Sequence, residues 1–170
     1  IGIFALLAKL ISTEDISVLN RLVEFAAVVT GTTIFHGVVV LPLLLWIFGK
    51  MSPMTFFKGT RTALITAFAT SSSSATMPLS LKCAQENLGV RPATAGFVIP
   101  LGTQLNMDGT ALYEAAAALF IANLMGLDLS IGQQLIVCVT AMIASLGAPG
   151  IPSAGMVTMI MVLQSVGLPA

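Results

Sequence analysis

Asn106-Met107-Asp108-Gly109-Thr110 lies in the middle of an apolar segment that covers residues 92–126. A carboxylate at membrane depth is costly and marks a candidate functional site. Gly109 has high conformational freedom, and the side chains of Asn106 and Asp108 compete with helical hydrogen bonds, so the stretch favours an interrupted helix. The carbonyls freed by the interruption, with the Asp108 carboxylate and the Asn106 amide, would suit a small cation. The alternative is a buried Asp108 that caps the second half of a kinked helix.

The composition indicates an integral membrane protein. Of the 170 residues, 56% are hydrophobic and 8% are charged, against about 25% charged residues in ordinary globular domains. The formal net charge is zero and no basic patch is present, so we expect no nucleic-acid partner. Cys83 and Cys138 are isolated in apolar surroundings and predict neither a disulfide nor a metal framework. No organic cofactor is implied.

The beginning of the chain is apolar. Residues 1–11 are too few to span a bilayer, which needs about 20 residues, and they predict the end of a transmembrane helix. They lack the charged start and the cleavage site of a signal peptide. Residues 12–21 are polar and acidic and predict a loop. We therefore expect a segment of a longer membrane protein.

Residues 22–49 predict the clearest transmembrane helix. Residues 25–49 contain no Asp, Glu, Lys or Arg, and as a helix they would be ~37 Å long. Pro42 predicts a kink, and Trp46 near the end of the helix suits a membrane interface. His36 lies in mid-span, where we expect a packing histidine rather than a ligand.

Residues 53–87 could either cross the membrane or enter it and turn back at the serine run 71–74. Turning back places five of the seven basic residues on one side, which the positive-inside bias identifies as cytoplasmic; they are Lys50, Lys58, Arg61, Lys82 and Arg91. Crossing would divide them between the two sides. We therefore predict a re-entrant hairpin with its tip at residues 71–76, and an extracellular loop at residues 12–21.

The same reasoning places the rest of the chain. Residues 91–126 then run outward as a transmembrane helix interrupted at residues 106–110. The turn that follows carries Asp128 and no basic residue, as expected outside. Residues 129–167 are uncharged and are interrupted at residues 147–153, so they predict a second re-entrant hairpin, entered from outside. Opposite entry is what an inverted repeat requires.

The two hairpin tips would offer two kinds of group. Each returning helix, beginning near residues 76–77 and 153–154, would present free N–H groups and a positive dipole end, which favour a carboxylate. The end of the entering helix at residues 145–147 would present carbonyls, which favour a cation. The alternatives are a flexible linker at 71–74 and an ordinary loop at 147–153. Apolar or uncharged residues surround both segments and argue for burial instead.

Glu114 is the second carboxylate at membrane depth. It precedes a run of alanines, residues 115–118, whose small side chains permit close helix packing. An intramembrane carboxyl group can carry a proton, so Glu114 is a proton-coupling candidate. A structural Glu114 that is hydrogen-bonded to a neighbour is an equally good interpretation. Tyr113 beside it can supply a phenol.

Three motifs resemble those of the dicarboxylate/amino acid:cation symporter family, which includes glutamate, aspartate and neutral amino acid transporters. They are SSSSATMP at 71–78, NMDGTALYE at 106–114 and GIPSAG at 150–155. The resemblance covers essentially the whole chain. It implies an all-α membrane protein, the core of an elevator-type transporter that moves against a trimeric scaffold. The second hairpin would be the extracellular gate.

The resemblance also numbers the elements. It implies that residues 1–11 end the fifth transmembrane helix, that 22–49 form the sixth, and that 91–126 form the seventh. The family's eighth helix and its scaffold helices would be absent from this chain. The eighth helix carries the residues that bind the substrate amine and side chain, so the choice of substrate depends on it.

The resemblance implies a set of site residues. Sodium ions would be held by Gly102, Gln104, Asn106, Met107, Asp108, Ser145, Leu146 and Ala148. Substrate would meet Ser71, Ser72, Ser73, Thr110, Ala148, Ile151 and Gly155. Glu114 matches a position tied to proton coupling in animal glutamate transporters, although some prokaryotic relatives carry Gln there.

The expected function is uptake of an acidic amino acid, aspartate or glutamate, coupled either to sodium alone or to sodium and protons. The protein would be a multi-pass homotrimer in the plasma membrane. Alternatives are a C4-dicarboxylate or neutral amino acid symporter, an anion channel, and an inactive piece of a transporter. We expect no enzyme, because the sequence lacks a Gly-x-Ser-x-Gly elbow, a His-Glu-x-x-His motif and a phosphate-binding Gly-rich loop.

Overall fold

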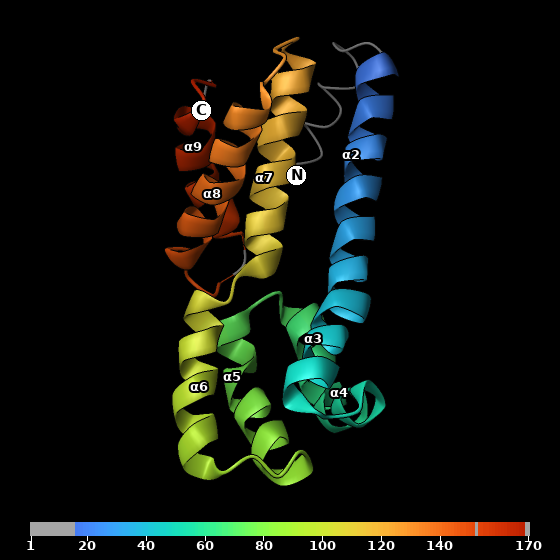
Figure 1. The fold of residues 1–170 in the computed structure, drawn as a ribbon, viewed down its shortest axis with the longest axis vertical. Coiled ribbons are helices and arrows are strands. Elements are labelled where there is room, and N and C mark those ends of the chain that lie inside the picture. Colours follow the sequence, from blue (N-terminus) through green and yellow to red (C-terminus); the bar gives the residue numbers. More distant parts are fainter. Residues whose placement is uncertain (1–15, 152, 169–170) are drawn as a thin grey trace, which may run out of the picture.

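A computed structural model describes residues 16–151 and 153–168, and every regular element in this part of the chain is helical. The expected end of a transmembrane helix at residues 1–11 lies outside the described residues. Figure 1 shows the elements in two tiers, with one long helix running beside both. In chain order the elements are α2 (Ile16–Phe35), the π-helical turn η1 (His36–Val40), α3 (Leu41–Gly49), α4 (Pro53–Thr70), α5 (Ser73–Lys82), the π-helical turn η2 (Cys83–Asn87), α6 (Pro92–Leu105), α7 (Asp108–Leu124), α8 (Ile131–Leu146) and α9 (Gly155–Ser165).

The elements α2, η1 and α3 form one continuous helix. Its segment Val18–Gly49 has 32 residues and a mean hydropathy of 2.0, and among the described residues it alone is long and apolar enough to cross a membrane. The prediction of a loop at residues 12–21 is wrong where it can be compared, because α2 begins at Ile16. Ile16, Leu19 and Val23 recur at spacings of three and four residues, which is a helical pattern that the polar neighbours obscured.

The kink expected at Pro42 takes the form of a change in helical pitch. Proline has no N–H to donate to the preceding turn, so the regular hydrogen-bond pattern cannot continue through it. The π-helical turn η1 lies immediately before α3, and Pro42 lies in the first turn of α3. Such turns are frequent at functional sites, and η1 begins with His36.

The first helical hairpin consists of α4 and α5. Ser71 ends α4 in a left-handed conformation (φ 49°), and the Ser72 hydroxyl caps α5 by accepting a hydrogen bond from the Ala75 amide at 3.2 Å. The tip is therefore shorter than the predicted 71–76, and the returning helix begins at Ser73 rather than near residue 76. The reason is that Ser72 is an efficient N-cap, which starts the helix immediately.

The interrupted helix consists of α6 and α7, which follow one another along the long axis of the molecule (Figure 1). Only Asn106 and Met107 are outside helical structure, so the predicted break of 106–110 is too long. The helix resumes at Asp108, and the Ala111 amide donates to the Met107 carbonyl at 3.0 Å. An acidic residue in a first helical turn is stabilised by the helix dipole, which explains this early restart.

The upper tier is a three-helix unit in which α8 and α9 form the second hairpin and pack on α7. A capping box formed by Ser130 and Gln133 starts α8. The core of this tier contains many small side chains, which allow the helices to approach closely; its buried members are Ala117, Ala118, Ala122, Val137, Ala141, Ala144, Met159, Val162, Leu163 and Leu168.

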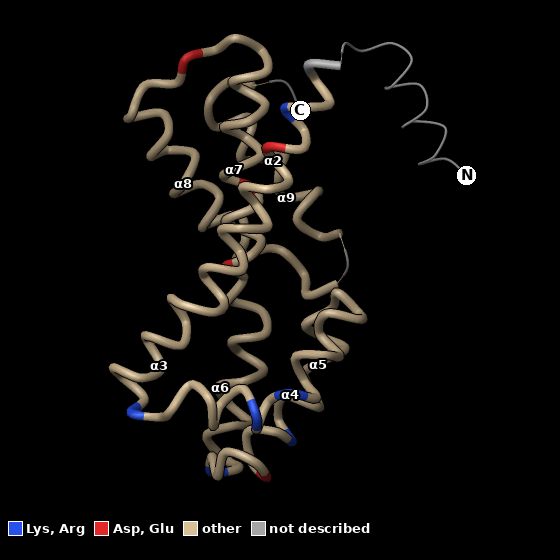
Figure 2. Tube along the Cα trace, turned by 90° about the vertical axis from the view of Figure 1, so that its right-hand side faces the viewer, with Lys and Arg blue, Asp and Glu red and all other residues tan. Residues whose placement is uncertain are grey.

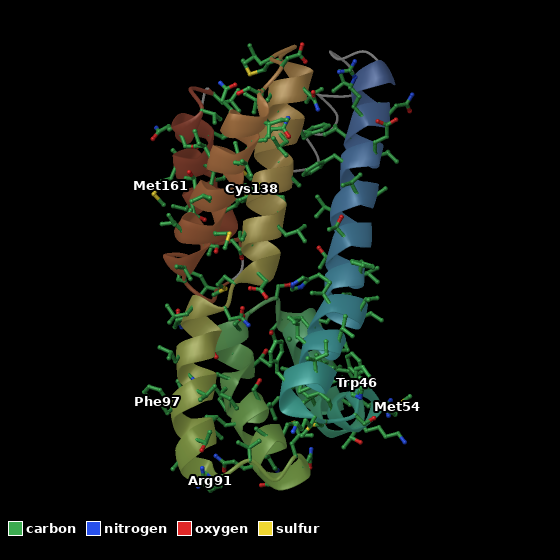
Figure 3. The ribbon with its side chains drawn as sticks, in the orientation of Figure 1. Trp46, Met54, Arg91, Phe97, Cys138 and Met161 are labelled. Carbon is green, nitrogen blue, oxygen red and sulfur yellow. The ribbon has the colours of Figure 1, made fainter. Side chains whose placement is uncertain are left out.

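The outer surface is apolar, and the basic residues gather at one end. Trp46, Phe97 and Met161 are 62%, 69% and 51% exposed and extend outward in Figure 3. In Figure 2 most of the Lys and Arg positions drawn in blue cluster at the end formed by α3, α4, α5 and α6. This uneven distribution of Lys and Arg bears on the orientation of the protein in a membrane.

Candidate functional site

The short gap between α6 and α7 brings Asn106 and Asp108 together. With its amide nitrogen turned toward the carboxylate, Asn106 lies 2.6 Å from Asp108 Oδ1 and 3.1 Å from Oδ2. Both residues are exposed. The gap also exposes the last carbonyls of α6 and the first N–H groups of α7, because helix ends lack intrahelical partners. Two carboxylate oxygens, an amide oxygen and nearby carbonyls form a donor set that suits a hard cation.

His36 approaches this gap from the long helix. Its Nε2 lies 3.8 Å from Asp108 Oδ2, and both side chains are partly exposed. The sequence predicts a packing histidine at this position rather than a ligand, whereas in the structure the His36 ring faces the Asp108 carboxylate. The only signal in the sequence was a polar side chain in mid-span. The partner could not be identified, because His36 and Asp108 are far apart in the chain.

The tips of the two hairpins meet. The Ser72 hydroxyl donates to the Gly150 carbonyl at 2.8 Å, and the Ser74 amide donates to the same oxygen at 3.1 Å. A Cβ at Gly150 would lie 2.8 Å from Ser74 Oγ, so only glycine fits this contact without a shift. The turn between α8 and α9 therefore reaches the level at which α6 meets α7 (Figure 1).

Gly155, the first residue of α9, lies directly against α7. A Cβ there would be 3.1 Å from Thr110 Cγ2 and 3.8 Å from Glu114 Oε1. Two predicted substrate residues, Thr110 and Gly155, are thus neighbours. Their contact joins the start of the returning helix to the first turns of α7.

Glu114 is fully buried at 0% exposure. The hydroxyl of Thr158 donates to Glu114 Oε1, while Oε2 has no hydrogen-bond partner among the described residues. The carboxyl group is therefore held from one side only. The sequence does not single out Thr158, although its position one helical turn after Gly155 places both residues on the same face of α9.

The remaining predicted sodium residues are divided between buried and exposed positions. Ser145 and Ala148 are buried, whereas Gln104 and Leu146 are exposed. The Gly102 and Ser145 carbonyls accept hydrogen bonds from the Asn106 and Ala148 amides. Contacts between α6 and α8 bring these two helices together. No group of three or more His, Cys, Asp or Glu side chains lies together in the described part of the chain.

The remaining predicted substrate residues are less closely assembled. Ser71, Ser73 and Ile151 are exposed, and no hydrogen bond from their side chains occurs among the described residues. Ser72 contacts the second tip through its hydroxyl, which the cap of α5 and Gly150 already occupy. Ser74, which is not among the predicted site residues, donates its backbone amide to the same Gly150 carbonyl.

A separate cavity of about 620 Å³ lies between α2 and α7. Its walls include Phe25 and Phe120, whose rings stack with centroids 4.7 Å apart, and the charged residues Arg21 and Glu24. None of the predicted site residues lines it. It lies toward the far end of α7, away from the gap at residues 106 and 107.

Comparison with known proteins identifies strong similarities over the whole chain. A family model described as the sodium:dicarboxylate symporter family matches residues 1–170. The chain is 50% identical over 171 residues to excitatory amino acid transporter 3 of Mus musculus, covering 100% of this chain and 33% of that protein. It is 49% identical over 167 residues to the putative sodium-dependent excitatory amino acid transporter glt-4 of Caenorhabditis elegans, covering 98% and 34%. It is 48% identical over 171 residues to excitatory amino acid transporter 1 of Homo sapiens, covering 99% and 32%. The chain thus spans about a third of the length of the curated relatives it matches.

Proposed function

The chain belongs to the sodium:dicarboxylate symporter family, and we propose that it serves sodium-coupled uptake of an acidic amino acid, aspartate or glutamate. Its relatives are named as excitatory amino acid transporters, and one of them as sodium-dependent. The predicted sodium residues include Asn106 and Asp108, and the predicted substrate residues include Thr110 and Gly155.

The observation that carries this proposal is the meeting of three chain segments at one level of the molecule. The gap between α6 and α7 holds Asn106 and Asp108 in hydrogen-bonding distance. The two hairpin tips are joined there by the Ser72 and Gly150 contact. Oxygen donors for a cation lie beside helix N-termini that favour an anion, which is the combination that a sodium-coupled carboxylate transporter needs.

We further propose that the two hairpins are re-entrant from opposite sides of the plasma membrane. The end that carries Lys58 and Arg61 would face the cytoplasm, and the turn that carries Asp128 would face outward. The turn between α8 and α9 would be the extracellular gate, opening by separation of Gly150 from Ser72. The transporter would act as a homotrimer by an elevator movement, and protonation of Glu114 would be coupled to transport.

The test is uptake of radiolabelled L-aspartate by the full-length protein in proteoliposomes, with and without an inward sodium gradient. Wild type should take up aspartate only with the gradient. Asp108→Asn should lose most of this uptake, because the neutral amide removes the anionic ligand for sodium. Asp128→Asn is the matched control, and it should retain uptake because Asp128 is exposed in the turn after α7.

Other outcomes would change the proposal in defined ways. Uptake of succinate or serine without uptake of aspartate would overturn the substrate assignment. Uptake driven by a proton gradient alone would place coupling at Glu114 instead of Asp108. A sodium-independent anion current without uptake of any substrate would favour a channel.

A further inference from the structure

Thr158 lies between two groups that belong to different parts of the site. Its hydroxyl donates to Glu114 Oε1, and its Oγ1 also lies 3.3 Å from the Gly155 carbonyl oxygen of its own helix. The side chain of Thr158 is itself buried, at 6% exposure. A hydroxyl group has one proton, so it can donate to only one of these two oxygens at a time.

We propose that Thr158 is the positioning residue through which the protonation of Glu114 acts on the first turn of α9. This inference rests on the proposed proton coupling at Glu114. When Glu114 is ionised, its carboxylate accepts the proton of the Thr158 hydroxyl. When Glu114 is protonated, its acid O–H can donate to Thr158 Oγ1, and the hydroxyl turns to donate to the Gly155 carbonyl.

The geometry gives this change a direct consequence at the substrate site. Gly155 touches α7 so closely that a Cβ would lie 3.1 Å from Thr110 Cγ2. A hydrogen bond gained or lost at the Gly155 carbonyl therefore acts on the residue where α9 begins. Thr110 and Gly155 are both predicted substrate residues, so the protonation state of Glu114 would affect the geometry of the substrate site.

The surroundings of Glu114 leave Thr158 as its main partner. The helices α8 and α9 contain no Asp, Glu, Lys, Arg or His, and the single cysteine of α8, Cys138, is exposed. From the long helix, His36 faces Asp108, and Arg21 and Glu24 line the cavity toward the far end of α7.

On α7 itself, the titratable side chains near Glu114 are those of Tyr113 and Asp108. Tyr113 packs toward the Phe25 ring, with centroids 6.4 Å apart. Asp108 is six residues away and pairs with Asn106. Among the described residues, the Thr158 hydroxyl is therefore the group that responds directly when Glu114 gains or loses a proton.

The experiment measures sodium-driven uptake by the full-length protein as a function of pH. Thr158→Val keeps the shape of the side chain and removes the donor to ionised Glu114. We expect the midpoint of the pH dependence to move by about one unit to higher pH, because hydrogen bonds to charged groups contribute about that much. Thr158→Ser keeps the hydroxyl and should retain the wild-type midpoint. If Thr158→Val is not inserted in the membrane, Thr158→Ala gives the same comparison.

Two further variants make the result specific to Glu114. Glu114→Gln should abolish the pH dependence, and adding Thr158→Val to it should change the pH profile no further. Thr60→Val is the matched control, since the Thr60 hydroxyl donates to its own helix, at 2.8 Å to the Phe56 carbonyl. It should leave the pH profile unchanged.

The outcomes separate the inference from the proposed function. An unchanged midpoint in Thr158→Val, or a shift that persists in the Glu114→Gln background, would overturn the role of Thr158. Wild-type pH dependence in Glu114→Gln would instead overturn proton coupling at Glu114, and the inference about Thr158 would fail with it.

Discussion

Gly155 is the residue at which the second hairpin comes closest to α7. A methyl group there would meet Thr110 Cγ2 at 3.1 Å, between two helices that are already in contact. We expect Gly155→Ala to destabilise the protein by about 1–3 kcal/mol, as overpacked core substitutions do. It should also raise the KM for substrate, because Gly155 and Thr110 are both predicted to bind it. The measurements are the apparent Tm in detergent and the KM in proteoliposomes.

Gly96 provides the control for this prediction. It lies inside α6, and a Cβ there would find no atom within 4 Å. Gly96→Ala should therefore keep or raise the apparent Tm, since alanine favours a helix by about 1 kcal/mol over glycine. If both variants lowered the apparent Tm equally, close packing at Gly155 would not be the cause.

The sequence identified the costly residues but not their partners. Asp108 and Glu114 stand out because a carboxylate at membrane depth is energetically costly and is therefore a functional candidate. The contacts of these residues with His36 and Thr158 come from other helices, and no local pattern encodes such pairings. The role of each predicted sodium and substrate residue remains a prediction.

Ser72 performs two tasks at the tip of the first hairpin. Its hydroxyl accepts from the Ala75 amide at the start of α5 and donates to the Gly150 carbonyl of the second tip. Ser72→Ala should therefore loosen both elements, since loss of an N-cap alone costs about 0.5–2 kcal/mol. We expect amide hydrogen exchange to rise by about fivefold, the effect of one lost hydrogen bond, in peptides covering residues 72–76 and 147–154.

Ser80→Ala is the matched control on the same helix, because no side-chain hydrogen bond of Ser80 occurs among the described residues. It should change neither peptide. Faster exchange at residues 72–76 alone would show that Ser72 caps α5 without holding the second tip. In that case the gate would depend on the backbone contact of Ser74 instead.

At the scale of helices, the order of elements follows from hydrophobicity and their exact ends do not. The sequence predicted turns at the serine run and at the Gly/Pro-rich stretch, and helices turn at both places. Several predicted ends agree with those observed, whereas α5 and α7 each begin three residues earlier than predicted, because the residues of the first turn decide where a helix begins. Ser72 starts α5, and Asp108 starts α7, earlier than composition suggests.

At the scale of the whole molecule, charge and shape suggest one orientation in the membrane. The basic residues gather at the end formed by α3, α4, α5 and α6 (Figure 2), whereas Asp128 lies in the turn between α7 and α8. Cytoplasmic segments carry an excess of Lys and Arg. If α4 and α5 form a re-entrant hairpin, residues 58 and 91 lie on the same side of the membrane. If residues 53–87 cross it, those two residues lie on opposite sides.

Cysteine labelling of intact cells distinguishes these arrangements. All native cysteines of the full-length protein, Cys83 and Cys138 among them, are first replaced by alanine, and single cysteines are then introduced as Lys58→Cys, Arg91→Cys and Asp128→Cys, all at exposed positions. A membrane-impermeant maleimide should label only the cysteine at 128, and the other two should react after permeabilisation. Labelling at 91 but not at 58 in intact cells would mean that residues 53–87 cross the membrane. Labelling at both 58 and 91, with protection at 128, would be consistent with the hairpin but would mean that the protein has the opposite orientation. The turn between α8 and α9 would then lie on the cytoplasmic side and could not be the extracellular gate.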